Sequence, residues 1–190
     1  EKSSNVIAQI MYRAYRSEPQ KFLDRLAQFG LTEKLGIDIE GEKKPFVPQP
    51  GTTGWSAMSI PWMSIGYELK QSPLQTLAFY NAVANNGEMV KPRFIKELRR
   101  ENRIIKSFQK EIVNPQIASS ETIRKLKKVL ENVVKKGTAN TIYSSNFSMA
   151  GKTGTAKKYV GRHVNEKGDT ISGGYSNQRY VASFAGFFPV

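Results

Sequence analysis

Four consecutive residues of this chain, Lys152, Thr153, Gly154 and Thr155, could hold a negatively charged group. The lysine ammonium supplies positive charge, the threonine hydroxyls supply hydrogen-bond donors, and a glycine lets the backbone come close to a ligand. This combination suits a carboxylate that must be held beside a reacting carbonyl. Since Thr and Gly are also common in ordinary turns, the tetrapeptide alone favours a plain strand and turn, and a partner motif is needed.

The letters Gly151-Lys152-Thr153 also end the phosphate-binding loop of many ATPases. That loop needs a glycine five positions earlier and a helix directly after the threonine. Position 146 is Asn146, and residues 154–160 have Gly and β-branched residues but no apolar helical period. The pattern predicts a strand, and the nucleotide-binding hypothesis fails on both requirements.

A second motif lies at the start of the chain, where Ser3 and Asn5 stand two positions apart just before an apolar stripe over residues 6–14. A serine or asparagine at this place is typical of a helix N-cap. Capping alone would account for Ser4 or Asn5, so the motif stays open between a cap and a partner for Lys152.

The sequence has few residues that could form another kind of catalytic or metal centre. The chain has no cysteine, which excludes thiol nucleophiles and Cys-ligated zinc, and its single histidine, His163, lies in a polar stretch. Such a histidine favours a solvated loop position over a catalytic base. We therefore expect no metal and no cofactor.

The net charge of +13 is concentrated in residues 91–136, which hold fourteen Lys and Arg against five Asp and Glu. A basic block can face nucleic acid, anionic lipid or solvent. Here Ile123, Leu126, Leu130 and Val133 recur at helical spacing, with lysines mostly on the other faces. The pattern predicts a packed helix with a charged outside. Without a stacking motif of aromatic and basic residues, we expect no nucleic-acid partner.

The 190 residues suffice for one mixed α/β domain. Ser72-Pro73 should begin a helix with Leu74, Leu77, Ala78 and Val83 buried, ending at Gly87. The rest of the expected elements are helices over 6–14, 19–29 and 120–136, an irregular connection over 37–66, a hairpin around 101–102, and strands over 149–157 and 180–188, the strands being antiparallel neighbours. No membrane span is predicted, so any anchor would lie outside this chain.

Together, Ser-x-Asn and, about 150 residues later, Lys-Thr-Gly-Thr resemble two of the three signatures of penicillin-recognising acyl-serine enzymes. Three longer segments, 64–92, 133–156 and 180–190, are similar to class B penicillin-binding proteins, which cross-link peptidoglycan. The resemblance implies an α/β (α+β) penicillin-binding/β-lactamase-like transpeptidase fold, with an antiparallel sheet flanked by helices. Residues 1–190 would be the C-terminal portion of a single transpeptidase domain, incomplete in this chain. Asn5, where many elongation-type members carry Asp, favours the division type.

The resemblance also implies roles for individual residues. Ser3 would shuttle a proton, Asn5 would bond the substrate's side amide, and Lys152 would raise the local positive potential. Thr153 and Thr155 would hold the terminal carboxylate, Gly154 would lie in the same substrate-binding strand, and the backbone N–H of Thr155 would donate to the oxyanion.

The implied partners are the peptidoglycan stem peptide with its lipid-linked precursor, β-lactam antibiotics, and cell-wall synthesis proteins. The implied location of the parent protein is the extracytoplasmic (periplasmic) face of the bacterial cytoplasmic membrane.

The family's first signature, Ser-x-x-Lys, has no counterpart upstream of Ser3 in this sequence. Ser107 and Lys110 spell it, but they follow Ser3 and fall in the predicted hairpin, where the lysine would stay solvated and protonated. Ser144-Ser145-Asn146 repeats Ser-x-Asn too close to Lys152 to form a separate wall. We expect the nucleophile upstream of residue 1 and the chain alone to be inactive. A D,D-carboxypeptidase or β-lactamase, a β-lactam sensor and a basic nucleic-acid-binding domain remain as alternatives.

Overall fold

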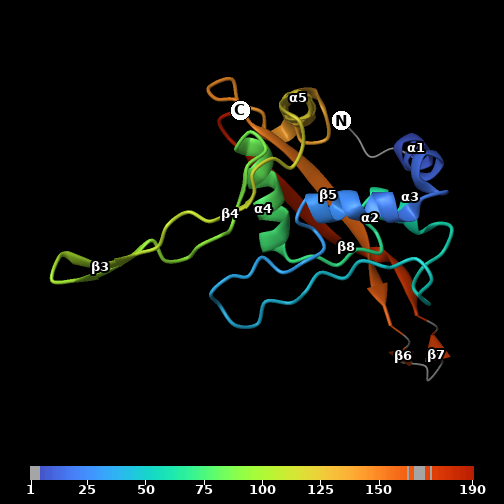
Figure 1. Ribbon diagram of the computed structural model, residues 1–190. Helices are drawn as coiled ribbons and strands as arrows, with labels where there is room; N and C mark the ends of the chain where they lie inside the picture. Colours follow the sequence, from blue (N-terminus) through green and yellow to red (C-terminus); the bar gives the residue numbers. More distant parts are fainter. Residues whose placement is uncertain (1–4, 162, 165–169, 172) are drawn as a thin grey trace.

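The computed structural model describes residues 5–161, 163–164, 170–171 and 173–190 (Figure 1). The helices are α1 (Asn5–Tyr15), α2 (Pro19–Gln28), α3 (Ser59–Ser64), α4 (Pro73–Ala84) and α5 (Ser120–Lys136), with a short 3-10 helix η1 (Asn140–Ile142). The strands are β1 (Met89–Val90), β2 (Glu97–Arg100), β3 (Arg103–Ser107), β4 (Ile112–Asn114), β5 (Ala150–Val160), β6 (His163–Val164), β7 (Thr170–Ile171) and β8 (Gly174–Phe187). No helix in this described part is long and apolar enough to cross a bilayer.

Strands β5 and β8 form a long antiparallel hairpin, which confirms the predicted pairing of the two C-terminal strands. Helix α4 packs against β8 and helix α5 packs against β5 (Figure 1). The expected antiparallel sheet with flanking helices is therefore present. Each of the other antiparallel sheets that the described residues form is likewise a pair of strands.

Helix α4 begins as the sequence predicts. The Ser72 hydroxyl accepts a hydrogen bond from the Gln75 N–H, and the Gln75 side chain accepts one from the Ser72 N–H. This capping box satisfies backbone donors that a helix start leaves unpaired. Ala78 and Val83 are buried as predicted, but Leu77 is 57% exposed and its predicted burial is wrong. Leu77 faces a groove beside β8 that no other described element fills.

The main core joins the elements around the β5–β8 hairpin. Its buried side chains come from α4, β1, α5, β5 and two connecting segments: Ala78, Ala82, Val83, Met89, Ile123, Leu130, Ala150, Leu35 and Ile117. Two of the four apolar positions predicted for the basic helix, Ile123 and Leu130, lie in this cluster, and Leu126 packs against it. Val133 is also buried, in a small cluster with Val134 and Ala139. The part of the basic block that falls in α5 is thus the outside of a packed helix, whereas the basic residues of 91–110 precede α5 and lie on or beside β2–β3.

A second, separate core lies in the N-terminal third. It combines Phe22, Leu23 and Leu26 of α2 with Ile60 and Met63 of α3. Helix α3 falls inside the stretch 37–66 that we expected to be irregular, so that prediction was too broad. The stretch was misjudged because a helix of this length has too few turns to show a period.

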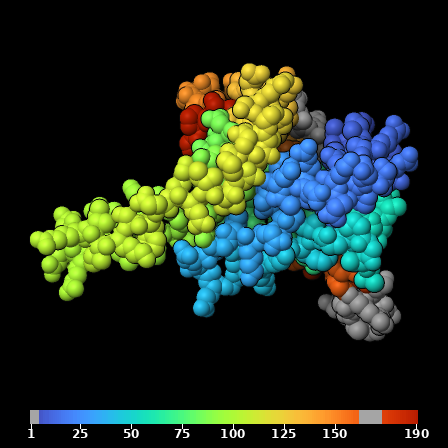
Figure 2. All heavy atoms as spheres, in the orientation of Figure 1, coloured from blue at the N-terminus to red at the C-terminus, as the bar shows by residue number. Residues whose placement is uncertain are grey.

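The hairpin β2–β3 is confirmed at the predicted place and projects from the rest of the molecule (Figures 1 and 2). Its turn residues Glu101 and Asn102 have positive φ angles of 47° and 64°. Positive φ at both turn positions matches the right-handed twist of the flanking strands.

Candidate active site

Strand β5 carries the Lys-Thr-Gly-Thr motif opposite the strand β8. Thr153 pairs with Phe184, and Thr155 pairs with Ala182. The ring of Phe184 lies over Gly151, where an added Cβ would come within 2.4 Å of the ring. Small residues beside the motif therefore let the two strands and this ring pack closely.

The outer edge of β5, away from β8, is open beside the motif. The backbone N–H of Lys157 donates to the Tyr67 hydroxyl at 3.3 Å, so it points away from β8. Backbone groups alternate in direction along a strand, so the N–H groups of Thr153 and Thr155 point to the same outer edge. Gly154 and Thr155 are exposed. The Thr155 N–H thus has the direction that an oxyanion donor facing an open edge requires.

The Lys152 ammonium curls back to the same edge. Its Nζ donates to the Thr153 carbonyl at 2.9 Å and lies 3.5 Å from the Thr153 hydroxyl oxygen. The side chain is half-buried. A positive charge and a hydroxyl therefore lie together on the open edge, as a carboxylate site needs.

Gly154 has a close neighbour that the sequence did not reveal. We expected the glycine to let a ligand approach the backbone. A Cβ at this position would also lie 2.6 Å from the Ser183 hydroxyl of β8, which would have to move to admit it.

The other half of the predicted site is only partly described. Ser3 lies outside the described residues, so its approach to Lys152 remains a prediction. Asn5 begins α1 and lines a shallow hollow with Val6, Gln9 and Ile10. Among the described residues, no hydrogen bond joins Asn5 to Lys152 or to Thr153.

The Ser-x-x-Lys sequence formed by Ser107 and Lys110 lies at the surface, as expected. Ser107 ends β3 and is exposed. Lys110 is 56% exposed, and its Nζ lies 2.7 Å from the Glu88 carboxylate. A hydrogen bond from Lys110 holds the pKa of Glu88 below its ordinary value, with a further bond from Asn85. This ion-paired lysine has no desolvated environment that would make it a base.

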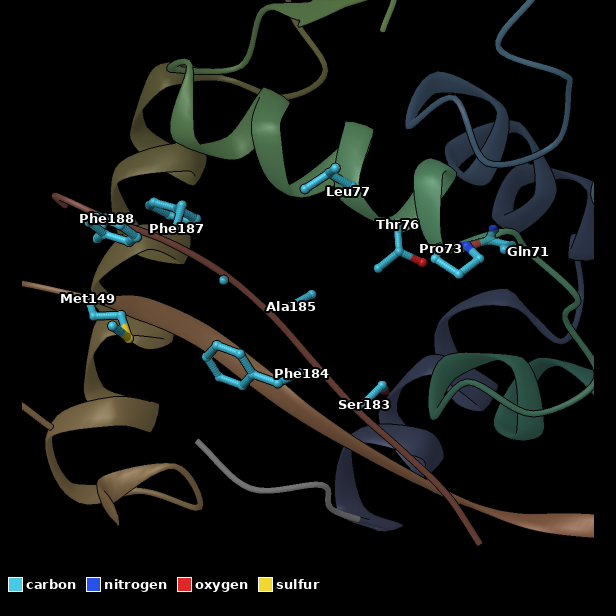
Figure 3. Close-up of a pocket in the computed structure, with 11 residues that line it drawn as sticks. Gln71, Pro73, Thr76, Leu77, Met149, Ser183, Phe184, Ala185, Phe187 and Phe188 are labelled. Atoms are coloured by element: carbon cyan, nitrogen blue, oxygen red, sulfur yellow. The ribbon is translucent and has the colours of Figure 1, made fainter. Parts of the chain in front are cut away.

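A groove of about 490 Å³ opens between α4 and β8 (Figure 3). Its walls are mostly apolar and include Leu77, Met149, Phe184 and Phe187. None of the four motif residues lines it. The groove is therefore separate from the Lys-Thr-Gly-Thr motif.

Two features near the motif escaped the sequence analysis. The first is a row of aromatic rings, Trp62, Tyr67, Tyr175 of β8 and Tyr159 of β5, with neighbouring centroids 5.4 to 5.7 Å apart. No periodicity brings these residues together, so only the fold could reveal them. The second feature is a hydrogen bond of 3.0 Å between the Thr138 and Thr153 hydroxyls. The sequence held one indication of this bond, because Thr138 carries a hydroxyl and directly follows Gly137, which ends α5.

Comparison with known proteins identifies the family to which this domain belongs. The family model for the penicillin-binding protein transpeptidase domain matches residues 1–190. The chain therefore belongs to this family, and the resemblance inferred from its motifs is confirmed.

Individual relatives agree with this assignment. The chain is 30% identical over 196 residues to penicillin-binding protein PbpB of Mycolicibacterium smegmatis, covering 99% of this chain and 28% of the relative. It is 27% identical to stage V sporulation protein D of Bacillus subtilis, covering 90% of this chain and 24% of the relative. The chain thus spans about a quarter of the length of these curated relatives.

Solved structures confirm the fold. The chain resembles penicillin-binding protein 3 of Mycobacterium tuberculosis in complex with aztreonam, with a TM-score of 0.74 and 29% identity over 97% of this chain and 40% of that chain. It equally resembles the transpeptidase domain of penicillin-binding protein 3 from Burkholderia pseudomallei, with a TM-score of 0.74 and 26% identity over 99% of this chain and 50% of that chain.

Proposed function

We propose that this chain supplies part of the catalytic site of a peptidoglycan D,D-transpeptidase that binds β-lactams. The observation that carries the proposal is the open edge of β5, where the Lys152 ammonium, the Thr153 hydroxyl and the Thr155 N–H lie together. Family membership supports the reaction class, and the β-lactams named with related structures, aztreonam and ampicillin, support the ligand class.

In the proposed reaction a serine hydroxyl attacks the carbonyl of the penultimate D-alanine of a stem peptide. The C–N bond to the terminal D-alanine breaks, and Ser3 passes the serine's proton to the leaving amine. An amine of a neighbouring strand then attacks the acyl ester, which forms the cross-link and returns the proton to the serine. Asn5 would hold the side amide of the donor peptide throughout.

The open edge of β5 would act in both steps. The Thr155 N–H would donate to the oxyanion that develops on the attacked carbonyl, and removing one such donor typically costs on the order of 100-fold or more in rate. Thr153 and Thr155 would hold the terminal carboxylate beside Lys152. A β-lactam, which also carries a strained amide and a carboxylate, would fit the same arrangement.

The attacking serine would come from a Ser-x-x-Lys segment outside residues 1–190, since Ser107 and Lys110 form an exposed surface pair. The parent protein would be anchored to the cytoplasmic membrane with this domain on the extracytoplasmic side. The Ser-x-Asn form of residues 3–5 supports a role in division.

The proposal is tested by intact-mass spectrometry after incubation with penicillin. The parent protein, containing the upstream segment, should gain one penicillin mass per molecule, whereas the 190-residue chain should gain none. An adduct on the 190-residue chain, mapped to Ser107 or another serine, would overturn the assignment of the nucleophile. Absence of any adduct on the parent protein would overturn the proposed function.

A further inference from the structure

Thr138 lies outside β5, and the turn that carries it is held tightly against the end of α5. The backbone N–H groups of Gly137 and Ala139 both donate to the Val133 carbonyl at 3.1 Å. A Cβ at Gly137 would lie 2.7 Å from the Val133 Cα, so this turn needs glycine. Ala139 is buried beside Val133. These contacts on both sides of Thr138 fix its position relative to α5, which packs on β5.

From this turn the Thr138 hydroxyl reaches the motif. Its oxygen lies 3.0 Å from the Thr153 hydroxyl oxygen, and either atom could be the donor. The direction follows from the partners. The Lys152 ammonium can only donate and a substrate carboxylate can only accept, so a Thr153 hydroxyl that holds a carboxylate gives its single proton to it. The bond between the two threonines must then run from Thr138 to Thr153.

We infer that Thr138 is a positioning residue for the carboxylate clamp. It orients the Thr153 hydroxyl toward the open edge and, because hydrogen bonds in a chain polarise one another, strengthens its donation to the carboxylate. Thr138 acts through Thr153 without touching the substrate. This inference rests on the proposed function, because it requires a ligand carboxylate at Thr153.

The bond is solvent-exposed and joins two neutral groups. A net hydrogen bond of this kind changes affinity by roughly 3- to 10-fold. The carboxylate is held both before and during acylation. Loss of the Thr138 hydrogen bond should therefore weaken binding and leave the rate of the acylation step unchanged.

The experiment uses the parent protein with penicillin over a range of concentrations, which separates the noncovalent dissociation constant from the limiting acylation rate. Thr138→Val, which keeps the shape but removes the hydroxyl, should raise the dissociation constant about 3- to 10-fold and leave the limiting rate unchanged. Thr138→Ser, which keeps the hydroxyl, should bind penicillin as the wild type does. Thr141→Val, an exposed threonine in the adjacent η1, serves as the matched control and should behave as wild type.

The methyl ester of the same penicillin gives the decisive comparison, because it has no carboxylate to hold. With the ester, Thr138→Val and the wild type should have equal dissociation constants. Wild-type binding of the free acid by Thr138→Val would overturn the inference. An equal loss with acid and ester would overturn it too, since the substitution would then act on the fold of the turn. If the wild-type parent protein forms no adduct at all, the proposed function itself fails.

Discussion

The β5–β8 and β2–β3 hairpins have the same antiparallel pairing but opposite surroundings. Helices α4 and α5 pack against β5–β8, and Ala150 at its base lies in the main core. Strands β2 and β3 stand away from the molecule, and Ile105 is 64% exposed (Figure 2). Ser107 ends β3 and Lys110 follows it closely, so both regions bring a lysine and a hydroxyl near each other in sequence, yet only β5 presents them on an edge shaped by neighbouring elements.

The comparison shows why a motif needs its supporting layer. A two-stranded hairpin without a third strand or a packed helix is marginally stable in water. Groups on it are solvated and mobile, so their chemistry stays close to that of free side chains. Packing of α4 and α5 on β5–β8 can hold Lys152 and Thr153 in one arrangement before any ligand binds.

The largest expected effect is a difference in acylation rate between substitutions of Lys152 and of Lys110. In the parent protein, Lys152→Ala should slow acylation by penicillin by about 100-fold, because positive charge is lost beside the developing oxyanion and the carboxylate. Lys110→Ala should acylate at the wild-type rate. Stopped-flow or quenched-flow acylation kinetics measure both. Equal slowing by the two substitutions would contradict the distinction between the hairpins.

The next effect concerns stability. Gly151→Ala should lower the free energy of unfolding of the transpeptidase domain by about 1 to 3 kcal/mol, because the added Cβ meets the Phe184 ring and lies 2.7 Å from the Ala185 carbonyl oxygen. Gly174→Ala, at the far end of the same hairpin with open space around it, should change the value by less than about 0.5 kcal/mol. Urea denaturation measures both. Similar values for the two variants would mean that β5 and β8 are not closely packed.

A smaller, local effect is expected in the exposed hairpin. Replacing Glu101 and Asn102 by Asn and Gly should stabilise β2–β3 by about 1 kcal/mol, because a non-glycine residue in the left-handed region is strained. Hydrogen exchange of the β2 and β3 amides should slow, while the midpoint of global unfolding stays unchanged. Glu101→Gln, which keeps the strain, is the control. A shift of the global midpoint would show that this hairpin is coupled to the core.

The smallest effect is electrostatic. Lys110 lowers the pKa of Glu88 through a hydrogen bond. A carboxyl whose pKa is lowered by folding contributes stability above its unfolded pKa, and this contribution is lost as pH falls through the folded pKa. Lys110→Ala should therefore raise the Glu88 pKa toward its ordinary value in an NMR titration, while Lys106→Ala leaves it unchanged. An unaltered Glu88 pKa in Lys110→Ala would show that the ion pair does not form in solution.

Local signals in the sequence determined much of this structure. The Ser72 cap, the apolar spacing of Ile123 and Leu130, and the β-branched residues without a helical period after Gly154 each depend on neighbours in the chain, so they predicted α4, α5 and the strand β5. The order of Ser-x-Asn and Lys-Thr-Gly-Thr predicted the family. It also assigned Lys152, Thr153 and Thr155 to one site with Ser3 and Asn5, and the roles of all five residues remain predictions.

Tertiary structure alone decided which groups meet across long stretches of sequence. Tyr67 reaches the Lys157 N–H from ninety residues away, and Thr138 reaches Thr153 from a turn that precedes the strand. Leu77 fits the apolar period of α4 but is exposed, because a periodic pattern predicts a face and cannot say what covers it. Contacts of this kind depend on how α5, α3 and β5 pack together, and no local pattern encodes that packing.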